Sequence, residues 1–312
     1  MLQGRPGVPG LRHRLGQDLV NPLAKGLPDS FWGIPVPGPV ALASGTCGFG
    51  LELDAMGLLK DVAFVFSKAV TPEPREGNEP PRIHDTGYGL LNSIGLANPG
   101  LDRVLSEVLP SAAGLSRPLV INVACESVGG FGSTVARLET SSVHTGYEVN
   151  VSCPNVEAGG MAFGVDPAAV ASVTAAVRRE TRRPITVKLT PNGGDIVGAA
   201  KAAEDSGADA VTVCNTFLGM KLDWRTGRPA LARGAGGYSS PALLPLVVAR
   251  VWQVGRAVRV PVIASGGVWE AGDVLELLAA GASLVQVGTG LLRRPSLPSE
   301  LMAGMRDLLC GS

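Results

Sequence analysis

One cysteine in the sequence has neighbours that favour proton-transfer chemistry. Cys153 lies in the segment Asn150-Val-Ser-Cys-Pro-Asn155, where two asparagines flank it in a proline-containing turn. A cysteine abstracts a proton when its thiolate is accessible and its pKa matches the reaction. The glycine-rich segment 156–164 is predicted to form a lid over this position. Free cysteines are more often inert core residues, which is how we interpret Cys47, Cys125, Cys214 and Cys310.

Two lysines and several asparagines follow other apolar runs. Lys68 and Lys188 each end such a run, and fixed cations there stabilise negative charge on a reduced flavin ring or an anionic substrate. The alternative is a pair of surface lysines whose ammonium groups reach water. Carboxamides carry both donors and an acceptor, which suits a planar ring with alternating N–H and C=O groups, whereas single asparagines often serve turns. The asparagines predicted to meet such a heterocycle are Asn92, Asn150, Asn155 and Asn215.

The elements that position these side chains are eight short runs rich in β-branched and other apolar residues. Alanine- and leucine-rich stretches at helical spacing lie between most of them, most clearly at 167–181, 195–206, 242–254 and 269–280. Strand–helix alternation with continuous apolar strands predicts a parallel sheet covered by helices. The predicted strands are 40–44, 64–70, 118–123, 147–152, 185–189, 210–215, 262–265 and 284–288.

Eight strands favour an α/β fold closed into a single-domain (β/α)8 barrel (TIM barrel), with a doubly wound open sheet as the alternative. The active site of a barrel lies at the C-terminal ends of its strands, where the lysines and asparagines stand. Glycines follow the last two strands, at Gly266-Gly267 and Gly288-Thr289, where barrels commonly bind phosphate through backbone N–H groups. Each pair taken alone reads equally well as ordinary turn glycines. We place the barrel at residues 33–312 and an irregular N-terminal extension, dense in proline, glycine and arginine, at residues 1–32.

The totals argue against several classes of protein. Lys plus Arg equals Asp plus Glu, 27 each, so the sequence gives no electrostatic case for binding nucleic acid or a membrane, and a homodimer would be unsurprising. Five scattered cysteines without a CxxC pair favour a reducing, cytoplasmic setting over disulfides or an in-chain zinc or iron–sulfur site. With three histidines, a histidine-built metal centre is not expected. The sequence has neither a signal-peptide apolar region nor a run of 18 charge-free apolar residues.

At these residues the sequence resembles the dihydroorotate dehydrogenases of class 1, and within them the 1B type. The most specific matches are RIHDTGYGLLNSIGLANPG (82–100) and NVSCPNVEAGGMAFGVDP (150–167). The resemblance runs from about residue 33 to the C-terminus, and it implies FMN-dependent oxidation of (S)-dihydroorotate to orotate in pyrimidine biosynthesis. Shorter matches are ALASGTCGFG (41–50), SKAVT (67–71), VKLTPN (187–192), CNTFLG (214–219), ASGGV (264–268) and VGTG (287–290).

The resemblance also implies roles for individual residues. Cys153 would be the base that removes the C5 proton of dihydroorotate, while the C6 hydride passes to N5 of FMN, and Lys68 would belong to the catalytic set. The substrate would be surrounded by Lys68, Asn92, Ile94, Gly95, Leu96, Asn150, Asn155, Asn215 and Thr216. FMN would be contacted by Ser44, Lys68, Ala69, Asn122, Asn150, Lys188, Cys214 and Ser240, with Gly266, Gly267, Gly288 and Thr289 at its phosphate.

Class 1B enzymes pair with a second subunit that carries FAD and an iron–sulfur cluster and passes electrons to NAD, whereas class 1A enzymes use fumarate. The chain departs from the family pattern at Tyr238 and at Ser240, where the family has a glycine near FMN. Residues 1–32 have no counterpart in the family pattern. Two alternatives stay open: an FMN oxidoreductase acting on another dihydropyrimidine or a specialised-metabolite ring, and a non-catalytic flavin-binding subunit. Dihydropyrimidine dehydrogenases tend to lack the asparagine that is Asn155 here, which favours dihydroorotate.

Overall fold

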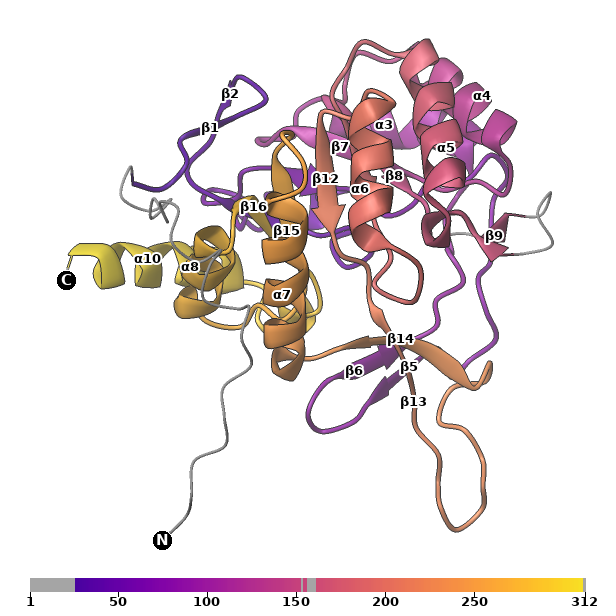
Figure 1. The fold of residues 1–312 in the computed structure, drawn as a ribbon, viewed down its shortest axis with the longest axis vertical. Helices are drawn as coiled ribbons and strands as arrows, with labels where there is room; N and C mark the ends of the chain where they lie inside the picture. The colour runs from indigo at the N-terminus through magenta and orange to yellow at the C-terminus, as the bar shows by residue number, and fades with distance from the viewer. Residues whose placement is uncertain (1–25, 153, 156–160, 311–312) are drawn as a thin grey trace, which may run out of the picture.

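The computed structural model of the chain describes residues 26–152, 154–155 and 161–310. Eight parallel strands close into a barrel in which the first strand pairs with the last (Figure 1). The closed ring confirms the predicted (β/α)8 barrel and rules out the open sheet. In order round the ring, the strands are β3 (Val40–Leu42), β4 (Val65–Phe66), β7 (Leu119–Val123), β8 (Gly146–Asn150), β11 (Ile185–Lys188), β12 (Ala210–Val213), β15 (Val262–Ser265) and β16 (Ala282–Val287).

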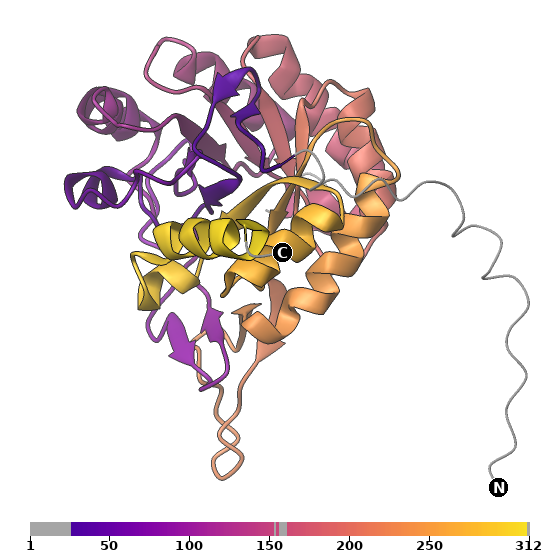
Figure 2. The ribbon, with the colours of Figure 1, turned by 90° about the vertical axis from the view of Figure 1, so that its left-hand side faces the viewer.

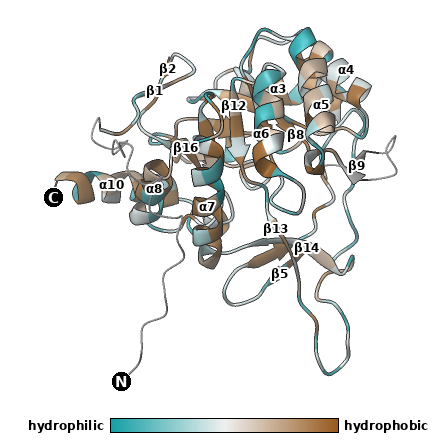
Figure 3. Ribbon diagram, viewed as in Figure 1, coloured by the Kyte–Doolittle hydropathy of each residue, from teal (hydrophilic) through white to brown (hydrophobic). Residues whose placement is uncertain are grey.

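Helical segments follow each barrel strand and surround the ring (Figures 1 and 2). Helix α5 begins as the sequence predicts, with the Asp166 carboxylate accepting from the Ala168 N–H and Pro167 at the first helical position. The helices carry both hydrophilic and hydrophobic stretches, as expected for elements with one face on a core and one in water (Figure 3). They are α1 (Leu51–Ala55), α2 (Leu101–Arg103), α3 (Leu109–Ala112), α4 (Val128–Leu138), α5 (Pro167–Glu180), α6 (Ile196–Asp205), α7 (Leu244–Gly255), α8 (Ala271–Ala279), α9 (Gly290–Arg293) and α10 (Leu297–Cys310), with a π-helical turn Val104–Val108 joining α2 to α3 and short 3-10 turns at Phe163–Val165 and Pro241–Leu243.

Alternation of side chains along the strands divides the core in two. Outward-facing residues such as Val149 pack with the helices in one large apolar cluster. Inward-facing Phe64 and Val120 belong to a second cluster inside the barrel, towards the N-terminal ends of the strands. Further along two of the strands the inward positions become polar: Asn122 on β7 lies two residues after Val120, and Gln286 on β16 lies two residues after Leu284. Both polar residues are fully buried. The inside of the barrel is therefore apolar at one end and polar at the other.

A small hairpin covers the apolar end of the barrel. Strands β1 (Ser30–Phe31) and β2 (Ile34–Pro35) are joined through Trp32 and Gly33, which both have positive φ, as a two-residue type I′ turn requires. The rings of Phe31 and Trp32 lie 5.9 and 5.7 Å from that of Phe64, which directly precedes β4. The hairpin thus spans the boundary that we placed between residues 32 and 33. Residues 1–25 lie outside the described part of the chain.

A four-stranded antiparallel sheet, which the sequence did not lead us to predict, lies beyond the opposite end of the barrel (Figure 1). Two long connections build it: the one after β4 contributes β5 (Ile83–Asp85) and β6 (Leu90–Asn92), and the one after β12 contributes β13 (Phe217–Met220) and β14 (Ala235–Ser239). The loop between β13 and β14 projects away from the barrel (Figure 2). A short hairpin of β9 (Pro154–Asn155) and β10 (Met161–Ala162) follows β8.

A polar cluster lies outside the barrel at the start of β8. The Tyr147 hydroxyl donates to the Glu139 carboxylate at 2.5 Å and is 2.7 Å from Nε2 of His144. Since the hydroxyl has one proton, its oxygen accepts from His144 Nε2–H, which leaves Nδ1 of His144 bare and without a partner among the described residues. Burial, and secondarily the nearby Arg183 guanidinium, lower the pKa of His144 from 6.5 to about 3.

We expect His144 to make the protein sensitive to mild acid. Between about pH 6.5 and pH 3 the unfolded chain binds a proton at His144 that the folded chain does not, so stability is present above pH 6.5 and is lost as the pH falls. The expected slope is up to about 1.4 kcal/mol per pH unit. Urea unfolding of the protein and of His144→Gln at several pH values between 7 and 5 measures it. The variant should show a shallower dependence, and equal slopes would contradict the assignment.

Candidate functional site

A cavity of about 560 Å³ opens between the C-terminal ends of the barrel strands and the four-stranded sheet. Its walls come from every barrel strand or from the residues that directly follow it, and the four-stranded sheet supplies Leu90, Asn92 and Tyr238. Polar groups from strands far apart in sequence therefore face one enclosed space, as the barrel fold requires. The barrel contributes Ser44, Lys68, Asn122, Asn150, Lys188, Cys214, Ser265 and Gly288, among others.

Most of the predicted site residues line this cavity. Gly95 does not, and its role is local: it has φ +73°, and a Cβ there would lie 2.6 Å from the Asn78 backbone nitrogen. Cys153 lies outside the described residues, and the Asn155 side chain is also outside them. The predicted residues found at the cavity are Ser44, Lys68, Ala69, Asn92, Ile94, Leu96, Asn122, Asn150, Lys188, Cys214, Asn215, Thr216, Ser240, Gly266, Gly267, Gly288 and Thr289.

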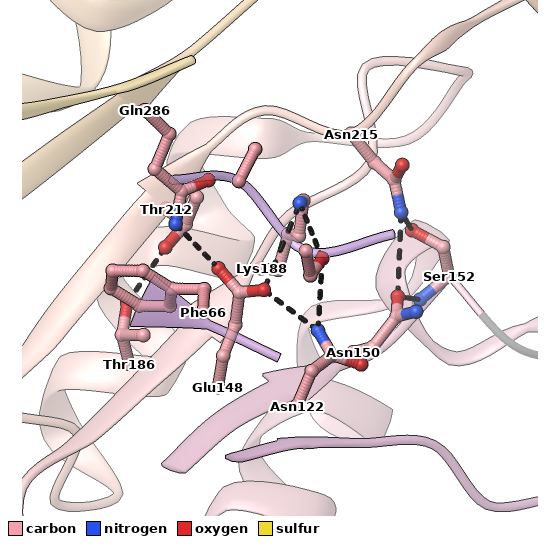
Figure 4. Close-up of polar contacts among 12 residues, drawn as sticks. Phe66, Asn122, Glu148, Asn150, Ser152, Thr186, Lys188, Thr212, Asn215 and Gln286 are labelled. Carbon is pink, nitrogen blue, oxygen red and sulfur yellow. Dashed lines mark hydrogen bonds and ion pairs between the residues drawn. The ribbon is translucent and has the colours of Figure 1, made fainter. Parts of the chain in front are cut away.

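Two of the asparagines hold Ser152, the residue directly before Cys153 in the sequence. The Asn150 side-chain oxygen accepts from the Ser152 N–H at 3.2 Å and from the Asn215 amide at 3.4 Å. The Asn215 amide also donates to the Ser152 hydroxyl at 3.0 Å (Figure 4). Strands β8 and β12 thereby fix the chain immediately before Cys153, so these asparagines are positioned by each other as well as by the barrel.

The two lysines have different electrostatic surroundings. Lys188 is 5% exposed, donates to the Ser44 hydroxyl at 3.1 Å and lies 3.7 Å from the Glu148 carboxylate, so its charge is compensated within the protein. Lys68 is half-buried, and its ammonium group makes no hydrogen bond or ion pair with another described residue. A partly desolvated cation without a counter-charge attracts an anion. Lys68 is therefore the cation that the cavity offers to a ligand.

The buried carboxylate of Glu148 is a feature that we did not predict. Glu148 lies inside the barrel with no exposed surface and accepts from the amides of Asn122 at 2.7 Å and Gln286 at 3.0 Å (Figure 4). Its sequence signal was its spacing: Glu148 stands two positions before Asn150, so both point into the barrel. Gln286 has the same relation to Gly288 on β16.

None of the described cysteines with a resolved pKa is a thiolate at neutral pH. Burial raises the pKa of Cys47 and of Cys214 to about 12, and that of Cys125 to about 11. Cys214 lines the cavity as a neutral thiol. Among the described residues, no group of three histidine, cysteine or acidic side chains is placed to hold a metal ion. No described helix has the length and apolar character needed to cross a membrane.

The end of the cavity beside β15 and β16 is built from glycine and serine. Gly266 and Gly267 have φ of +120° and +82°, and a Cβ on Gly267 would lie 2.6 Å from the Leu244 Cα, so glycine lets α7 pack close to the strand end. Ser240, which replaces the family glycine, is buried; its hydroxyl accepts from the Ala242 N–H at 3.2 Å and donates to the Tyr88 carbonyl at 2.7 Å. The serine thus ties the turn between β5 and β6 to the start of α7.

The cavity fits a flavin ring on its donors. The polar ring atoms of an oxidised flavin are acceptors, apart from the N3–H group, and Lys68 and Lys188 both line the cavity as cations. Lys68 has no counter-charge among the described residues, so it can face a ring oxygen or a carboxylate. Asn122 Oδ1 and Gln286 Oε1 also have no partner among the described residues, but both atoms are closed off from the cavity and do not meet a ligand in this conformation.

Comparison with known proteins gives one consistent family. The family model described as "Dihydroorotate dehydrogenase" matches residues 27–309. The chain is 44% identical over 278 residues to "Dihydroorotate dehydrogenase B (NAD(+)), catalytic subunit" of Pelobacter propionicus, covering 89% of this chain and 91% of that protein. It is 43% identical to the protein of the same name from Bacillus pumilus, covering 89% of each.

A solved structure supports the fold. The crystal structure of the dihydroorotate dehydrogenase of Eimeria tenella, in complex with ferulenol, superposes with a TM-score of 0.73 at 22% identity. The match covers 93% of this chain and 89% of that one. At this identity the likeness establishes the shared barrel architecture and nothing further about the ligand.

Proposed function

The chain belongs to the dihydroorotate dehydrogenase family, and on that premise we propose that it oxidises (S)-dihydroorotate to orotate with FMN as the first electron acceptor. The observation that carries the proposal is Lys68, which has no counter-charge among the described residues and lies in a cavity lined by Asn92, Asn150 and Asn215. Dihydroorotate has a ring with alternating N–H and C=O groups, and it carries one carboxylate. The amides match the ring, and Lys68 matches the carboxylate.

The reaction removes a proton from C5 and a hydride from C6, which leaves the C5=C6 double bond of orotate. Bound FMN supplies the acceptor for the hydride. We propose Cys153 as the base that takes the proton, because its position in the sequence follows Ser152, which Asn150 and Asn215 hold in place. The four-stranded sheet covers the cavity and limits the access of water to the reacting atoms.

The residues proposed for FMN lie along the strand ends from β3 to β16. Ser44, Asn122 and Lys188 line the inner part of the cavity, where they would meet the ring. Gly266, Gly267, Gly288 and Thr289 stand at the ends of β15 and β16, where we propose that backbone N–H groups hold the phosphate.

The test is an anaerobic titration of the purified protein with dihydroorotate, followed in the flavin absorption band. We expect a yellow protein whose band bleaches at stoichiometric substrate. Cys153→Ala should keep the yellow flavin and lose at least about a hundredfold in the rate of bleaching, the size expected for removal of a general base. A yellow wild-type protein that dihydroorotate leaves oxidised would move the proposal to another ring substrate. Full-speed bleaching of the variant would remove Cys153 as base.

We further propose that NAD⁺ is reached through a partner subunit carrying FAD and an iron–sulfur cluster. The relatives named above are catalytic subunits of NAD⁺-dependent enzymes, and no metal-binding cluster occurs among the described residues of this chain. The purified chain should then reduce artificial dyes but not NAD⁺. Direct reduction of NAD⁺ by the chain alone would contradict the proposed need for a partner subunit. A homodimer and a cytoplasmic location complete the proposal, in keeping with the zero net charge and the unpaired state of the four described cysteines.

A further inference from the structure

Glu148 has no part in the reaction proposed above, yet it occupies the centre of the barrel. It stands on β8 opposite Asn122 of β7 and beside Thr186 of β11, and it has no exposed surface. A buried carboxylate carries a large desolvation penalty unless it is paired and hydrogen-bonded. Here both oxygens are used, and a lysine lies within ion-pair distance. The surroundings of Glu148 therefore compensate a buried charge that makes no contribution to the apolar core of the barrel.

The carboxylate determines which way two amides face. An ionised carboxylate only accepts hydrogen bonds, so the NH2 groups of Asn122 and Gln286 must point towards it. The carbonyl oxygen of each amide is then turned away from Glu148, and both oxygens are left without a partner among the described residues. The Asn122 NH2 group is also 3.3 Å from the Ser44 hydroxyl, which leaves it no free donor for the cavity.

The same carboxylate also determines the charge of the cavity wall at Lys188. Its Oε2 lies 3.7 Å from the Lys188 ammonium, and the two side chains are almost completely buried, so at short range their charges cancel. Lys68 has no such partner among the described residues. Without Glu148, two uncompensated lysines would line the cavity.

We propose that Glu148 is a positioning residue that sets the charge of the cavity wall at Lys188: its carboxylate, held in place by the amides of Asn122 and Gln286, compensates the lysine. The inference rests on the proposed binding of FMN. With Lys188 compensated, the reduced, more negative flavin is stabilised less than two uncompensated lysines would stabilise it.

The test measures FMN binding and the flavin midpoint potential of Glu148→Gln. Glutamine has the same shape, but its own NH2 group competes for the amides and its side chain is neutral. The FMN measurement shows that the variant still holds the flavin. We expect the uncompensated Lys188 to favour the reduced flavin about tenfold, a positive shift of about 30 mV for a two-electron couple.

The midpoint potential separates positioning from a merely structural role. A loosened barrel would weaken FMN binding and leave the potential where it was, so that outcome would overturn the proposal, as would no change in either quantity. Thr186→Val is the matched control: it removes a buried hydroxyl that is 3.0 Å from Thr212 and next to Glu148 without changing charge, and it should leave the potential unchanged. FMN binding is measured by fluorescence quenching on flavin-depleted protein.

A second variant covers the case in which Glu148→Gln does not fold. Glu148→Asp keeps the negative charge but draws it back from Lys188 by one methylene group, so it should shift the potential in the same direction by less than about 30 mV. No shift in this variant would overturn the proposal. If the wild-type protein itself bound no FMN, the proposed function would fail first, which distinguishes that failure from failure of the assignment to Glu148.

Discussion

Replacing Lys188 by methionine should lower the free energy of unfolding by about 3–5 kcal/mol, the range measured when one partner of a buried ion pair is removed. Lys188 is 5% exposed and Glu148 is fully buried, so methionine fills the space of the lysine stem while the carboxylate loses its counter-charge. The penalty comes mainly from the stranded carboxylate and only in small part from lost contacts. Urea unfolding of the flavin-depleted proteins measures it, because ligand binding alone shifts apparent stability and Lys188 is itself a proposed FMN contact.

The double variant Lys188→Met with Glu148→Gln is the control for this explanation. If the stranded charge is the cause, neutralising it should recover more than half of the lost stability, since removing both charges of a buried pair is often nearly neutral. Additive losses in the double variant would show that Lys188 acts through packing. A single variant that lost less than about 1 kcal/mol would contradict the pairing altogether.

Replacing Lys68 by alanine should reduce kcat/KM for dihydroorotate by about a hundredfold to a thousandfold, the size expected when one preorganised charged group is removed from an enclosed site. Lys68 has no counter-charge among the described residues, so a bound carboxylate is its natural partner. The flavin should stay bound, because the remaining ring and phosphate contacts are untouched. Steady-state turnover with an artificial acceptor, combined with the flavin spectrum, measures both effects.

The control for Lys68 is a lysine that lies outside the cavity. Lys201→Ala, on the exposed face of α6, removes the same charge from the protein and should leave turnover unchanged. A neutral dihydropyrimidine should be turned over equally by wild type and Lys68→Ala, since it offers no carboxylate. Unchanged KM and kcat for dihydroorotate in Lys68→Ala would remove the assigned role and reopen the choice of substrate.

The barrel could be predicted because its physical cause is local. Most of the strands are short runs rich in apolar residues, and the longer helices have an apolar stripe, so both patterns can be read from neighbouring positions. The four-stranded sheet could not be predicted in this way. Its strands are three to five residues long, and β14 reads Ala-Gly-Gly-Tyr-Ser, with too few apolar side chains to show a period. Those strands are held by pairing across more than a hundred residues, as in Gly237 with Asn92.

The candidate site also divides into residues that the sequence predicts and features that it does not predict. Asn150 and Lys188 end strands and Lys68 follows β4 by two residues, and the rule that barrel sites lie at strand ends was enough to select them. The difference between the two lysines was not predictable, because it depends on Glu148, which stands on another strand. Glu148 could have been noticed as a charge at an inward position of an apolar strand, but its partner Gln286 lies nearly 140 residues away along the chain.

Closure of the ring between β3 and β16 has a consequence for how the protein is made. Val40 pairs with Val285 and Leu42 with Val287, so the ring cannot close until the last strand has left the ribosome. Contacts of such long sequence separation form slowly, and until then the charged interior of the barrel stands open to water. Because the cavity takes residues from both of these strands, cofactor capture can only follow synthesis of nearly the whole chain. The appearance of the yellow flavin colour during translation would thus report the last step of folding.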